Sequence, residues 1–414
     1  MTIRWITDRL GTSPWSKELV SGPHSVVDVR LLRDAAGNPP ALIRNKIDEA
    51  FRHLEDGRRV IICCDYGVSR SNVIAAGVLA RQENISLDES LRRVIRATGE
   101  SGIKVDLVQD MRRALDISIP EADSPSVLVL GGDGFIGRNL STLMGNTLGC
   151  DAIGQDMDLV WNPVLLDAAM QGSGANRLLF CWHPPGLDTN QAAGQLVSAL
   201  RNALEVCRVR KAGIVFLSGQ QVFSGHRRVG EVSFSEEDEP QPGGAAGDAL
   251  FLGEVLVKQY AIRYDLPVLI VRPSYIYGEG DERPWLLNTL IRKALRGDDV
   301  VTHHYENGSP LIDLLHVSDL AKALSLAMEV GQTGVLHVSS DNRITTRELA
   351  KRIVRMAGSS SRLASVEMPG GYRAVRLVSK IRSRLPQWAP TVSLEAGLRR
   401  VVAALAQDLL KDET

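Results

Sequence analysis

The sequence predicts two α/β domains in one chain, the second built on a doubly wound parallel sheet with a small C-terminal lobe. Three observations support this prediction. Strand-like and helix-like segments alternate along most of the chain, as a parallel sheet requires. A polar, proline-containing segment at 119–125 interrupts that alternation and indicates a linker. The length of 414 residues exceeds the ~100–200 residues of an average domain, so we expect domains at 1–118 and 126–410.

The composition excludes several classes of protein. Hydrophobic residues make up 44% of the chain and the net charge is -1, so nothing favours nucleic acid or an anionic membrane as a partner. No apolar run approaches the ~20 residues of a membrane span, and the N-terminus is not typical of a secretory signal. Five irregularly spaced cysteines argue against disulfides and against a metal site. A cytoplasmic location is expected, because reactive thiols stay reduced there.

The first domain is predicted to alternate strands with helices and to end in three helices. Strands are expected at 25–32 and 59–63, where β-branched and apolar residues run together. The spacing of apolar residues predicts helices at 41–54, 71–81, 87–98 and 103–115. This order places residues 64–70 in a loop between a buried strand and a buried helix.

That loop has the residues of a phosphate-binding site. Cys64 is a candidate nucleophile, Ser71 can donate a hydrogen bond to its sulfur, and Arg70 offers a planar fork for two phosphate oxygens. Backbone N–H groups facing the start of the helix would complete the site, and glycine permits the tight loop. The predicted phosphate-binding residues are Asp65, Tyr66, Gly67, Val68, Ser69 and Arg70.

The pattern Cys-x-x-Gly-x-Ser-Arg-Ser at 64–71 resembles the dual-specificity branch of the protein tyrosine phosphatases. The resemblance implies a small cysteine-phosphatase α/β domain that hydrolyses phosphate monoesters through a phosphocysteine and needs no cofactor. Its substrate would be a phosphorylated small molecule or a phosphoprotein. A general acid is expected on a loop upstream of the nucleophile, where Asp34 lies, with Asp28 as the rival. Cys63 stands where the family has His.

A glycine-rich turn opens the second domain. Strands are expected at 126–130, 150–155, 177–182, 212–217, 267–272 and 334–339, with helices between them. The turn after the first of these strands has the spacing Gly-x-x-Gly-x-x-Gly, which lets the backbone approach a dinucleotide pyrophosphate closely. The predicted cofactor-binding residues are Gly131, Gly134, Phe135, Ile136 and Gly137, together with Asp156, whose carboxylate would bind the adenosine ribose.

This turn and several later segments resemble the extended short-chain dehydrogenase/reductase family, the NAD-dependent epimerases and dehydratases of nucleotide sugars. The likeness is carried by Gly-Phe-Ile-Gly at 134–137 and by the segments 266–278 and 315–321. The resemblance implies a Rossmann-type fold with a substrate lobe, NAD(P) as cofactor, a nucleotide sugar as ligand and a homodimer.

The catalytic residues of that family are missing here. The family uses Ser or Thr with Tyr-x-x-x-Lys, and register from the flanking motifs places these positions on Gly219, Ala246 and Leu250. Lys258 and Tyr260 lie nearby, out of register, and are interpreted as exposed helix residues. Acid–base catalysis commonly contributes ~10²–10⁴-fold. The second domain is therefore predicted to bind its nucleotide without redox catalysis.

Three functions remain open from the sequence. The main prediction is a cysteine-dependent phosphatase joined to a redox-inactive nucleotide-sugar-binding domain. An alternative is an NAD(P)-dependent nucleotide-sugar epimerase, dehydratase or reductase with other acid/base groups, such as Ser218 with His183 or Lys258. The last is a non-catalytic protein that binds phosphate and nucleotide.

Overall fold

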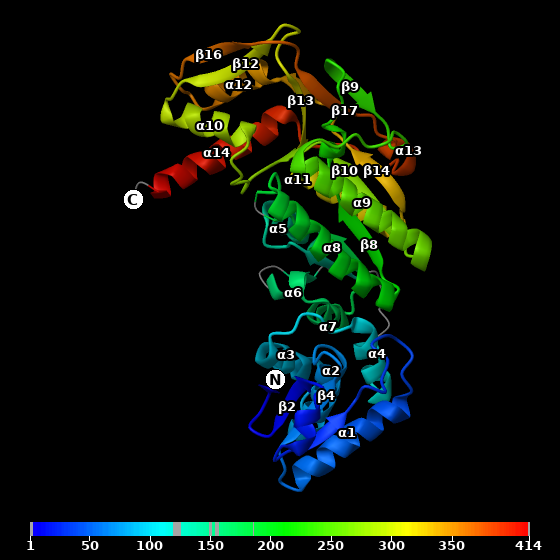
Figure 1. Ribbon diagram of the computed structural model, residues 1–414. Coiled ribbons are helices and arrows are strands. Elements are labelled where there is room, and N and C mark those ends of the chain that lie inside the picture. Colours follow the sequence, from blue (N-terminus) through cyan, green and yellow to red (C-terminus); the bar gives the residue numbers. More distant parts are fainter. Residues whose placement is uncertain (1–2, 119–125, 149–150, 154–156, 185, 413–414) are drawn as a thin grey trace. The chain divides into compact units, whose positions relative to one another are not determined.

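A computed structural model describes residues 3–118, 126–148, 151–153, 157–184 and 186–412 (Figure 1). The expected linker at 119–125 lies outside the described residues. The chain forms two compact units. The first comprises Met1–Ser124, Asp156–Asn176 and Arg201–Ala212, and the second comprises Pro125–Gln155, Arg177–Leu200 and Gly213–Thr414. The first unit thus includes two segments that the sequence had suggested for the second domain.

The first unit contains a four-stranded sheet in the order β1-β2-β4-β3. Its strands are β1 (Arg4–Trp5), β2 (Leu10–Pro14), β3 (Ser25–Asp28) and β4 (Val60–Cys64). Strand β4 is entirely buried and pairs in parallel with both β2 and β3, as its apolar sequence Val-Ile-Ile-Cys-Cys favours. The strand expected at 25–32 is shorter than predicted, because the chain turns away after Asp28.

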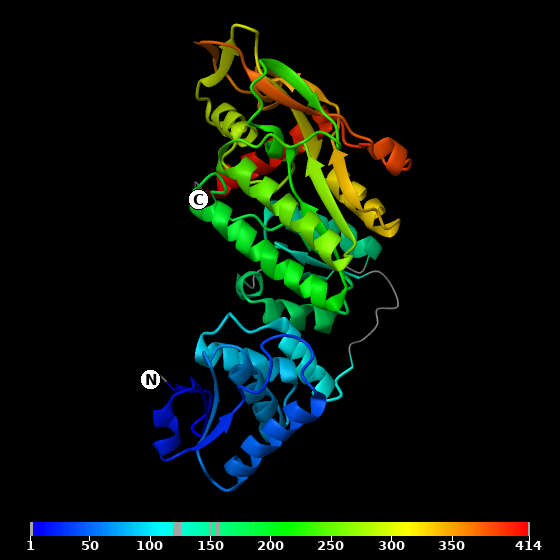
Figure 2. The same cartoon turned by 45° about the vertical axis from the view of Figure 1, so that its right-hand side comes forward.

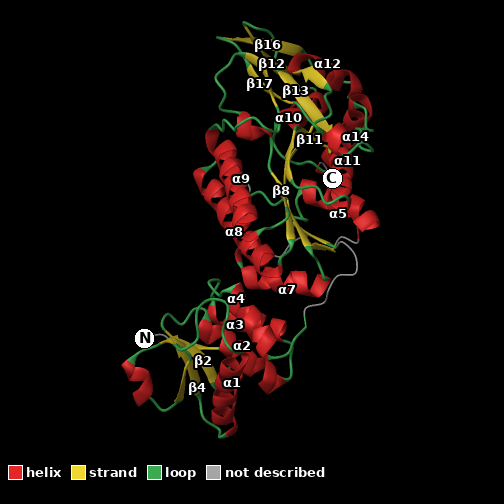
Figure 3. Ribbon diagram, turned by 90° about the vertical axis from the view of Figure 1, so that its right-hand side faces the viewer, coloured by secondary structure: helices red, strands yellow, loops and turns green. Residues whose placement is uncertain are grey.

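Helices follow in the predicted order. They are η1 (Lys17–Ser21), α1 (Pro40–Glu55), α2 (Arg70–Glu83), α3 (Leu87–Thr98) and α4 (Val105–Ala114). Helices α1 and α2 pack against the sheet (Figures 2 and 3). Helix α2 is buried from Arg70 to Ala80, which its run of alanine and aliphatic residues permits. Ser86 caps α3 by accepting a hydrogen bond from the backbone of Glu89, and the left-handed Gly99 ends that helix.

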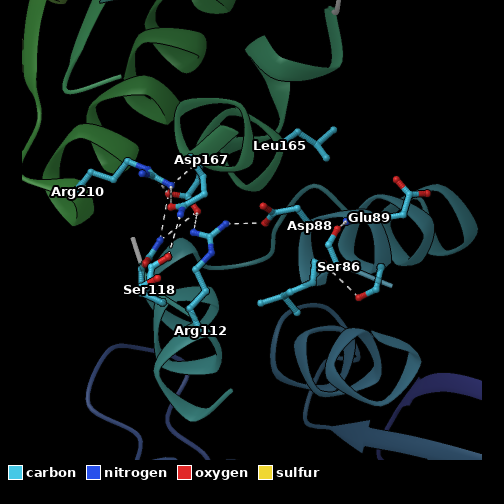
Figure 4. A network of polar contacts seen from close by, with 12 residues as sticks. Ser86, Asp88, Glu89, Arg112, Ser118, Leu165, Asp167 and Arg210 are labelled. Carbon is cyan, nitrogen blue, oxygen red and sulfur yellow. Dashed lines mark hydrogen bonds and ion pairs between the residues drawn. The ribbon is translucent and has the colours of Figure 1, made fainter. Parts of the chain in front are cut away.

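Within the first unit, a buried ionic network joins the segments 156–176 and 201–212 to its N-terminal part (Figure 4). Helices α6 (Met157–Trp161) and α7 (Pro163–Ser173) belong to these segments, as does the C-terminal part of α8 (Asn190–Arg210). Asp167 of α7 has no exposed surface and accepts hydrogen bonds from Gln109 and Arg112 of α4 and from Arg210 of α8. Arg112 also binds Asp88 at 2.6 Å. Three arginine and glutamine partners thus compensate the burial of one carboxylate.

The second unit is organised around a six-stranded parallel sheet in the order β14-β10-β8-β7-β5-β6. Its strands are β5 (Val127–Leu130), β6 (Asp151–Ile153), β7 (Arg177–Phe180), β8 (Gly213–Leu217), β10 (Val268–Pro273) and β14 (Gly334–Val338). All six strands lie where the sequence predicts them. The chain leaves β5 for β6 on one side and continues to β7 on the other, so the strand order reverses beside β5.

Helices cover both faces of this sheet, as the doubly wound prediction requires. They are α5 (Phe135–Leu148), α8, α9 (Gly244–Tyr264) and α11 (Val317–Glu329). Figure 3 shows α8 and α9 on one face and α5 and α11 on the other. The core between sheet and helices is built from aliphatic strand residues such as Val129, Leu179 and Val271, packed against α11.

A smaller lobe completes the second unit. It contains η2 (Gln220–Phe223), β9 (Gly230–Phe234), β11 (Tyr275–Tyr277), α10 (Leu286–Arg296), β12 (Val300–Tyr305), β13 (Leu311–His316), β15 (Arg343–Thr345), α12 (Thr346–Met356), β16 (Leu363–Met368), β17 (Arg373–Leu377), α13 (Ile381–Arg384) and α14 (Leu394–Asp412). Its short strands pair across long stretches of sequence, such as β9 with β17. Within the described ranges, no helix combines the length and apolarity needed to cross a membrane.

Candidate functional site

The glycine turn lies between β5 and α5, at the carboxyl ends of the parallel strands. Gly131 has a φ of +95°, and a side chain there would come within 2.7 Å of the Trp182 backbone. A Cβ on Gly137 would lie 1.9 Å from the carbonyl oxygen of Gly131. Both positions therefore require glycine, since any Cβ would collide with backbone. Gly134 is less crowded, with 3.5 Å from an added Cβ to its nearest neighbour.

Two of the three remaining residues predicted to bind the cofactor lie within the described residues. Phe135 starts α5 and is buried, and Ile136 packs against the sheet core. Asp156 lies outside the described residues. The turn sits where the strand order reverses, which is the usual ligand crevice of an open α/β sheet. Glycine at such positions is what lets a dinucleotide pyrophosphate approach a backbone turn closely.

The three positions at which the family resemblance expects catalytic residues are apolar, and two of them adjoin in space. A Cβ on Gly219, just before η2, would lie 3.6 Å from Cδ1 of Leu250 on α9. Leu250 is 3% exposed, and Ala246 is half-buried one turn earlier on the same helix. The register counted from the sequence agrees with this proximity. No acid or base is present at these three positions.

Ser218 and Lys258, two of the alternative acid/base candidates, are bound to the same carboxylate. Ser218 donates a hydrogen bond to Glu254 at 2.7 Å, and Arg272 binds both oxygens of that carboxylate at 2.8 and 2.6 Å. All three side chains are buried. Lys258 is half-exposed, with its Nζ 3.9 Å from Glu254. The Ser218 hydroxyl is thus a hydrogen-bond donor to the buried ion pair between Glu254 and Arg272, which is a structural role.

Tyr260 corrects one interpretation made from the sequence. It was expected to be an exposed helix residue, but it is 8% exposed and its ring lies 5.2 Å from that of Tyr264. The α9 face that carries Glu254 and Val257 turns inward again at this position, three residues after Val257. The ring therefore contributes to packing.

His183, the remaining acid/base candidate, follows β7 and is half-buried. Burial and, to a smaller extent, the nearby Arg283 guanidinium lower the pKa of its imidazole to about 4, against the opposing effect of hydrogen bonds with the Leu217 and Cys181 backbone. The ring is thus neutral at pH 7. A neutral imidazole can accept a proton from a ligand hydroxyl.

The predicted phosphate loop brings its polar groups together in the first unit. The Cys64 thiol donates to the Ser71 hydroxyl at 3.4 Å. Gly67 has a φ of +68°, and a Cβ there would lie 2.5 Å from the Pro14 nitrogen. Arg70 is buried, and its guanidinium donates to the Asp65 carboxylate at 2.5 Å and to the Leu32 carbonyl at 3.1 Å. The arginine fork is therefore occupied by a carboxylate of the loop itself.

Other residues of that loop have separate partners. Ser69 accepts a hydrogen bond from the Lys104 backbone at 3.1 Å, and the Val68 carbonyl accepts one from Asn72 at 2.7 Å. Tyr66 is 78% exposed. Burial raises the pKa of the Cys63 thiol to about 12, so this residue, at the family's His position, is a neutral thiol at pH 7.

The two general-acid candidates differ in their surroundings. Asp34 is exposed, on a loop held in place by the hydrogen bond from the Asn38 backbone to Asp110 at 2.8 Å. Asp28 accepts hydrogen bonds from the Arg30 guanidinium at both carboxylate oxygens, and that hydrogen bonding lowers its pKa. Asp28 is accordingly a structural ion-pair partner, as its position in an apolar run suggested.

Comparison with known proteins relates the second unit to nucleotide-sugar enzymes. Residues 188–375 match the family model described as the RmlD substrate binding domain. The chain is 25% identical over 171 residues to the low-salt glycan biosynthesis protein Agl12 of Haloferax volcanii, a match that covers 41% of this chain and 54% of the relative. It is 31% identical over 163 residues to a probable GDP-L-fucose synthase 1 of Oryza sativa, covering 36% and 48%. The chain spans about half the length of these relatives.

Solved structures show the same fold. A dTDP-glucose 4,6-dehydratase from Bacillus anthracis in complex with NAD aligns with a TM-score of 0.60 at 20% identity, covering 69% of this chain and 97% of that one. A UDP-glucose 4-epimerase from Thermotoga maritima with UDP-glucose aligns at 0.59 and 20% identity, covering 69% and 99%. The second unit therefore has the Rossmann-type α/β fold. Within it, residues 188–375 are similar to the RmlD substrate binding domain.

These relatives correct the main functional prediction. The matched proteins include a probable GDP-L-fucose synthase, a dTDP-4-dehydro-6-deoxy-D-allose reductase and a dTDP-glucose 4,6-dehydratase, so the assignment of the enzyme as a cysteine-dependent phosphatase is wrong. The expected cysteine-phosphatase domain and phosphoprotein substrate find no support among them. The error has a physical origin: an eight-residue motif specifies a strand–loop–helix nest, and here Asp65 occupies the arginine that a phosphate would need. Binding of an anion by residues 64–71 stays a prediction.

Proposed function

We propose that the second unit binds a pyridine dinucleotide at the glycine turn and a nucleotide sugar against the smaller lobe. The observation that carries this proposal is the steric requirement for glycine at Gly131 and Gly137, since a Cβ at either position would strike backbone. Such a turn at the carboxyl end of the first strand is where dinucleotide pyrophosphates bind. One similar structure holds NAD and another holds UDP-glucose, which supports both halves of the proposal.

The residues that would hold the dinucleotide are those of the turn. The backbone from Gly131 to Gly137 would bind the pyrophosphate, and Asp156 is the sequence-based candidate for the adenosine ribose. The cofactor, when bound, would supply hydride exchange. The apolar positions Gly219, Ala246 and Leu250 provide neither the proton transfer nor the ribose-binding cation of the family. The proposal is therefore binding of both ligands without the Tyr–Lys step.

Titration tests this proposal directly. Nicotinamide fluorescence would follow binding of NADH and NADPH, and calorimetry would follow UDP-glucose and dTDP-glucose. We expect saturable binding of at least one dinucleotide and one nucleotide sugar. Absence of any dinucleotide binding at millimolar concentration would overturn the proposal.

A second candidate function is turnover of the bound sugar with His183 as the proton acceptor. The observation that favours it is the position of His183 at the end of β7, directly after Trp182, whose backbone an added Cβ on Gly131 would approach within 2.7 Å. Change in the nicotinamide absorbance band with nucleotide sugars would detect such turnover. Loss of that change in His183→Ala, with dinucleotide binding retained, would support the role of the imidazole. An unchanged rate in the variant would exclude it.

A further inference from the structure

Arg283 lies against the glycine turn, although it is far from it in sequence. It belongs to the segment between β11 and α10, and its guanidinium carbon is 5.1 Å from the centre of the Phe135 ring. Gly278 in the same segment also approaches this ring, since an added Cβ would be 3.5 Å from Cζ of Phe135. Phe135 follows Gly134 directly. The segment therefore packs beside the place proposed for the dinucleotide.

The side chain of Arg283 is held in one orientation. Its Nε and Nη2 donate to the two oxygens of Asp281 at 2.7 and 2.8 Å, and Nη2 also donates to the Ile276 carbonyl at 3.0 Å. Asp281 is 2% exposed and accepts a further hydrogen bond from Trp285 at 2.9 Å. This buried carboxylate fixes the guanidinium plane, which reduces the entropy lost when the group binds a ligand.

The outer edge of the same guanidinium stays available. The Arg283 side chain is 48% exposed, and its Nη1 has no hydrogen-bond partner among the described residues. The hydrogen bonds that hold the loop use Nε and Nη2. They do not involve Nη1. An oriented guanidinium that presents N–H donors matches phosphate oxygens particularly well.

We propose that Arg283 binds the diphosphate group of a nucleotide ligand, as the cation of a site whose family lysine position is occupied by Leu250. This inference rests on the proposed nucleotide binding. Two diphosphates could be the ligand, that of the dinucleotide and that of the nucleotide sugar. Both present the same chemistry to a guanidinium, so separate titrations have to distinguish them.

The test compares Arg283→Gln with the wild type in separate titrations of NADH and UDP-glucose. Loss of one charge-assisted contact should weaken binding of the true ligand by about tenfold to a hundredfold. The other ligand should bind as before. Arg296→Gln is the matched control, an exposed arginine in the last turn of α10, and it should bind both ligands like the wild type.

A second variant guards against misfolding, because Arg283→Gln leaves Asp281 buried with fewer partners. The double variant Asp281→Asn with Arg283→Gln removes both charges of the pair together, and circular dichroism would verify its fold. We expect the same loss of affinity in the folded double variant. If both variants bind both ligands with wild-type affinity, the proposed role of Arg283 is overturned, while the proposed nucleotide binding stands. Failure of the wild type to bind either ligand would instead overturn the proposed function.

Discussion

Gly137 is the residue at which backbone geometry constrains the sequence most tightly. An added Cβ would lie 1.9 Å from a backbone oxygen, and no side-chain rotation can relieve that contact. We expect Gly137→Ala to abolish NADH binding and to cost about 1–3 kcal/mol of stability, as overpacking does. NADH fluorescence titration and thermal unfolding would measure the two effects.

Gly194→Ala is the control for this substitution. Gly194 lies within α8, and an added Cβ there would meet nothing within 4 Å. Alanine in an unhindered helix position should stabilise the chain by up to about 1 kcal/mol. Unaltered NADH binding by Gly137→Ala would contradict the steric argument.

His337 makes stability depend on pH. It has no exposed surface, and its Nε2 lies 3.3 Å from Nη1 of Arg272. Burial lowers its pKa from 6.5 to about 4. Between these values the unfolded chain binds a proton that the folded chain does not, so the contribution is complete above pH 6.5 and is lost as the pH falls towards 4.

We therefore expect urea unfolding to give a smaller free energy of unfolding at pH 5 than at pH 7. His337→Gln removes the titrating group while keeping a donor and an acceptor. The difference between the two pH values should shrink in this variant. A difference equal to that of the wild type would show that His337 does not contribute.

At the scale of elements, α7 shows how a helix can depend on a single carboxylate. Asp167 is fully buried with Arg112, Arg210 and Gln109 as partners. Removing one partner of a buried ionic pair typically costs about 3–5 kcal/mol, because the other charges stay buried. We expect Asp167→Ala to destabilise the first unit by about that amount in chemical denaturation.

An exposed ion pair supplies the control for Asp167→Ala. Asp48 binds Arg81 with both side chains about half exposed. Asp48→Ala should cost no more than about 1 kcal/mol, since solvent screens such pairs. Equal losses for the two variants would contradict the importance of burial in the α7 network.

The principal strands and helices could be predicted from the sequence, because the residue patterns that specify them lie within a few consecutive residues. Helix α3 was predicted at 87–98 and spans Leu87–Thr98, with its serine cap and its terminal glycine in place. The six strands of the parallel sheet consist mainly of apolar residues, and they too were predicted. The short strands of the smaller lobe were missed. Strands such as β9 and β17 gain their stability by pairing across more than a hundred residues, for which short segments carry no signal.

At the scale of the whole molecule, the boundaries of the first unit depend on distant segments. Arg112 is 1% exposed and pairs with Asp167, outside the expected domain of residues 1–118. We expect a fragment of residues 1–118 to melt at a lower temperature than the first unit of the full chain, because Arg112 is left without that partner.

Arg112→Leu in the same fragment provides a comparison. Replacing a buried charge by an apolar group is often neutral or stabilising, so this variant should melt higher than the unaltered fragment. Circular dichroism would measure both melting temperatures. Equal melting of the fragment and the full chain's first unit would show that the later segments are dispensable.

The homodimer expected from the family resemblance stays a prediction, and the exposed Leu252, Val255 and Ile262 of α9 support it.

The amino-acid order was sufficient to identify the parallel sheet, the glycine turn and the missing Tyr-x-x-x-Lys, because each is encoded within a few consecutive residues. The same locality misled at residues 64–71, where the motif predicted an enzyme class that the relatives contradict. Only the tertiary structure shows that the Asp65 carboxylate binds the Arg70 guanidinium and that Asp167 joins α7 to α4. It also shows that Arg283 lies over the Phe135 ring. These contacts depend on how separated segments pack, which no local spacing of residues records.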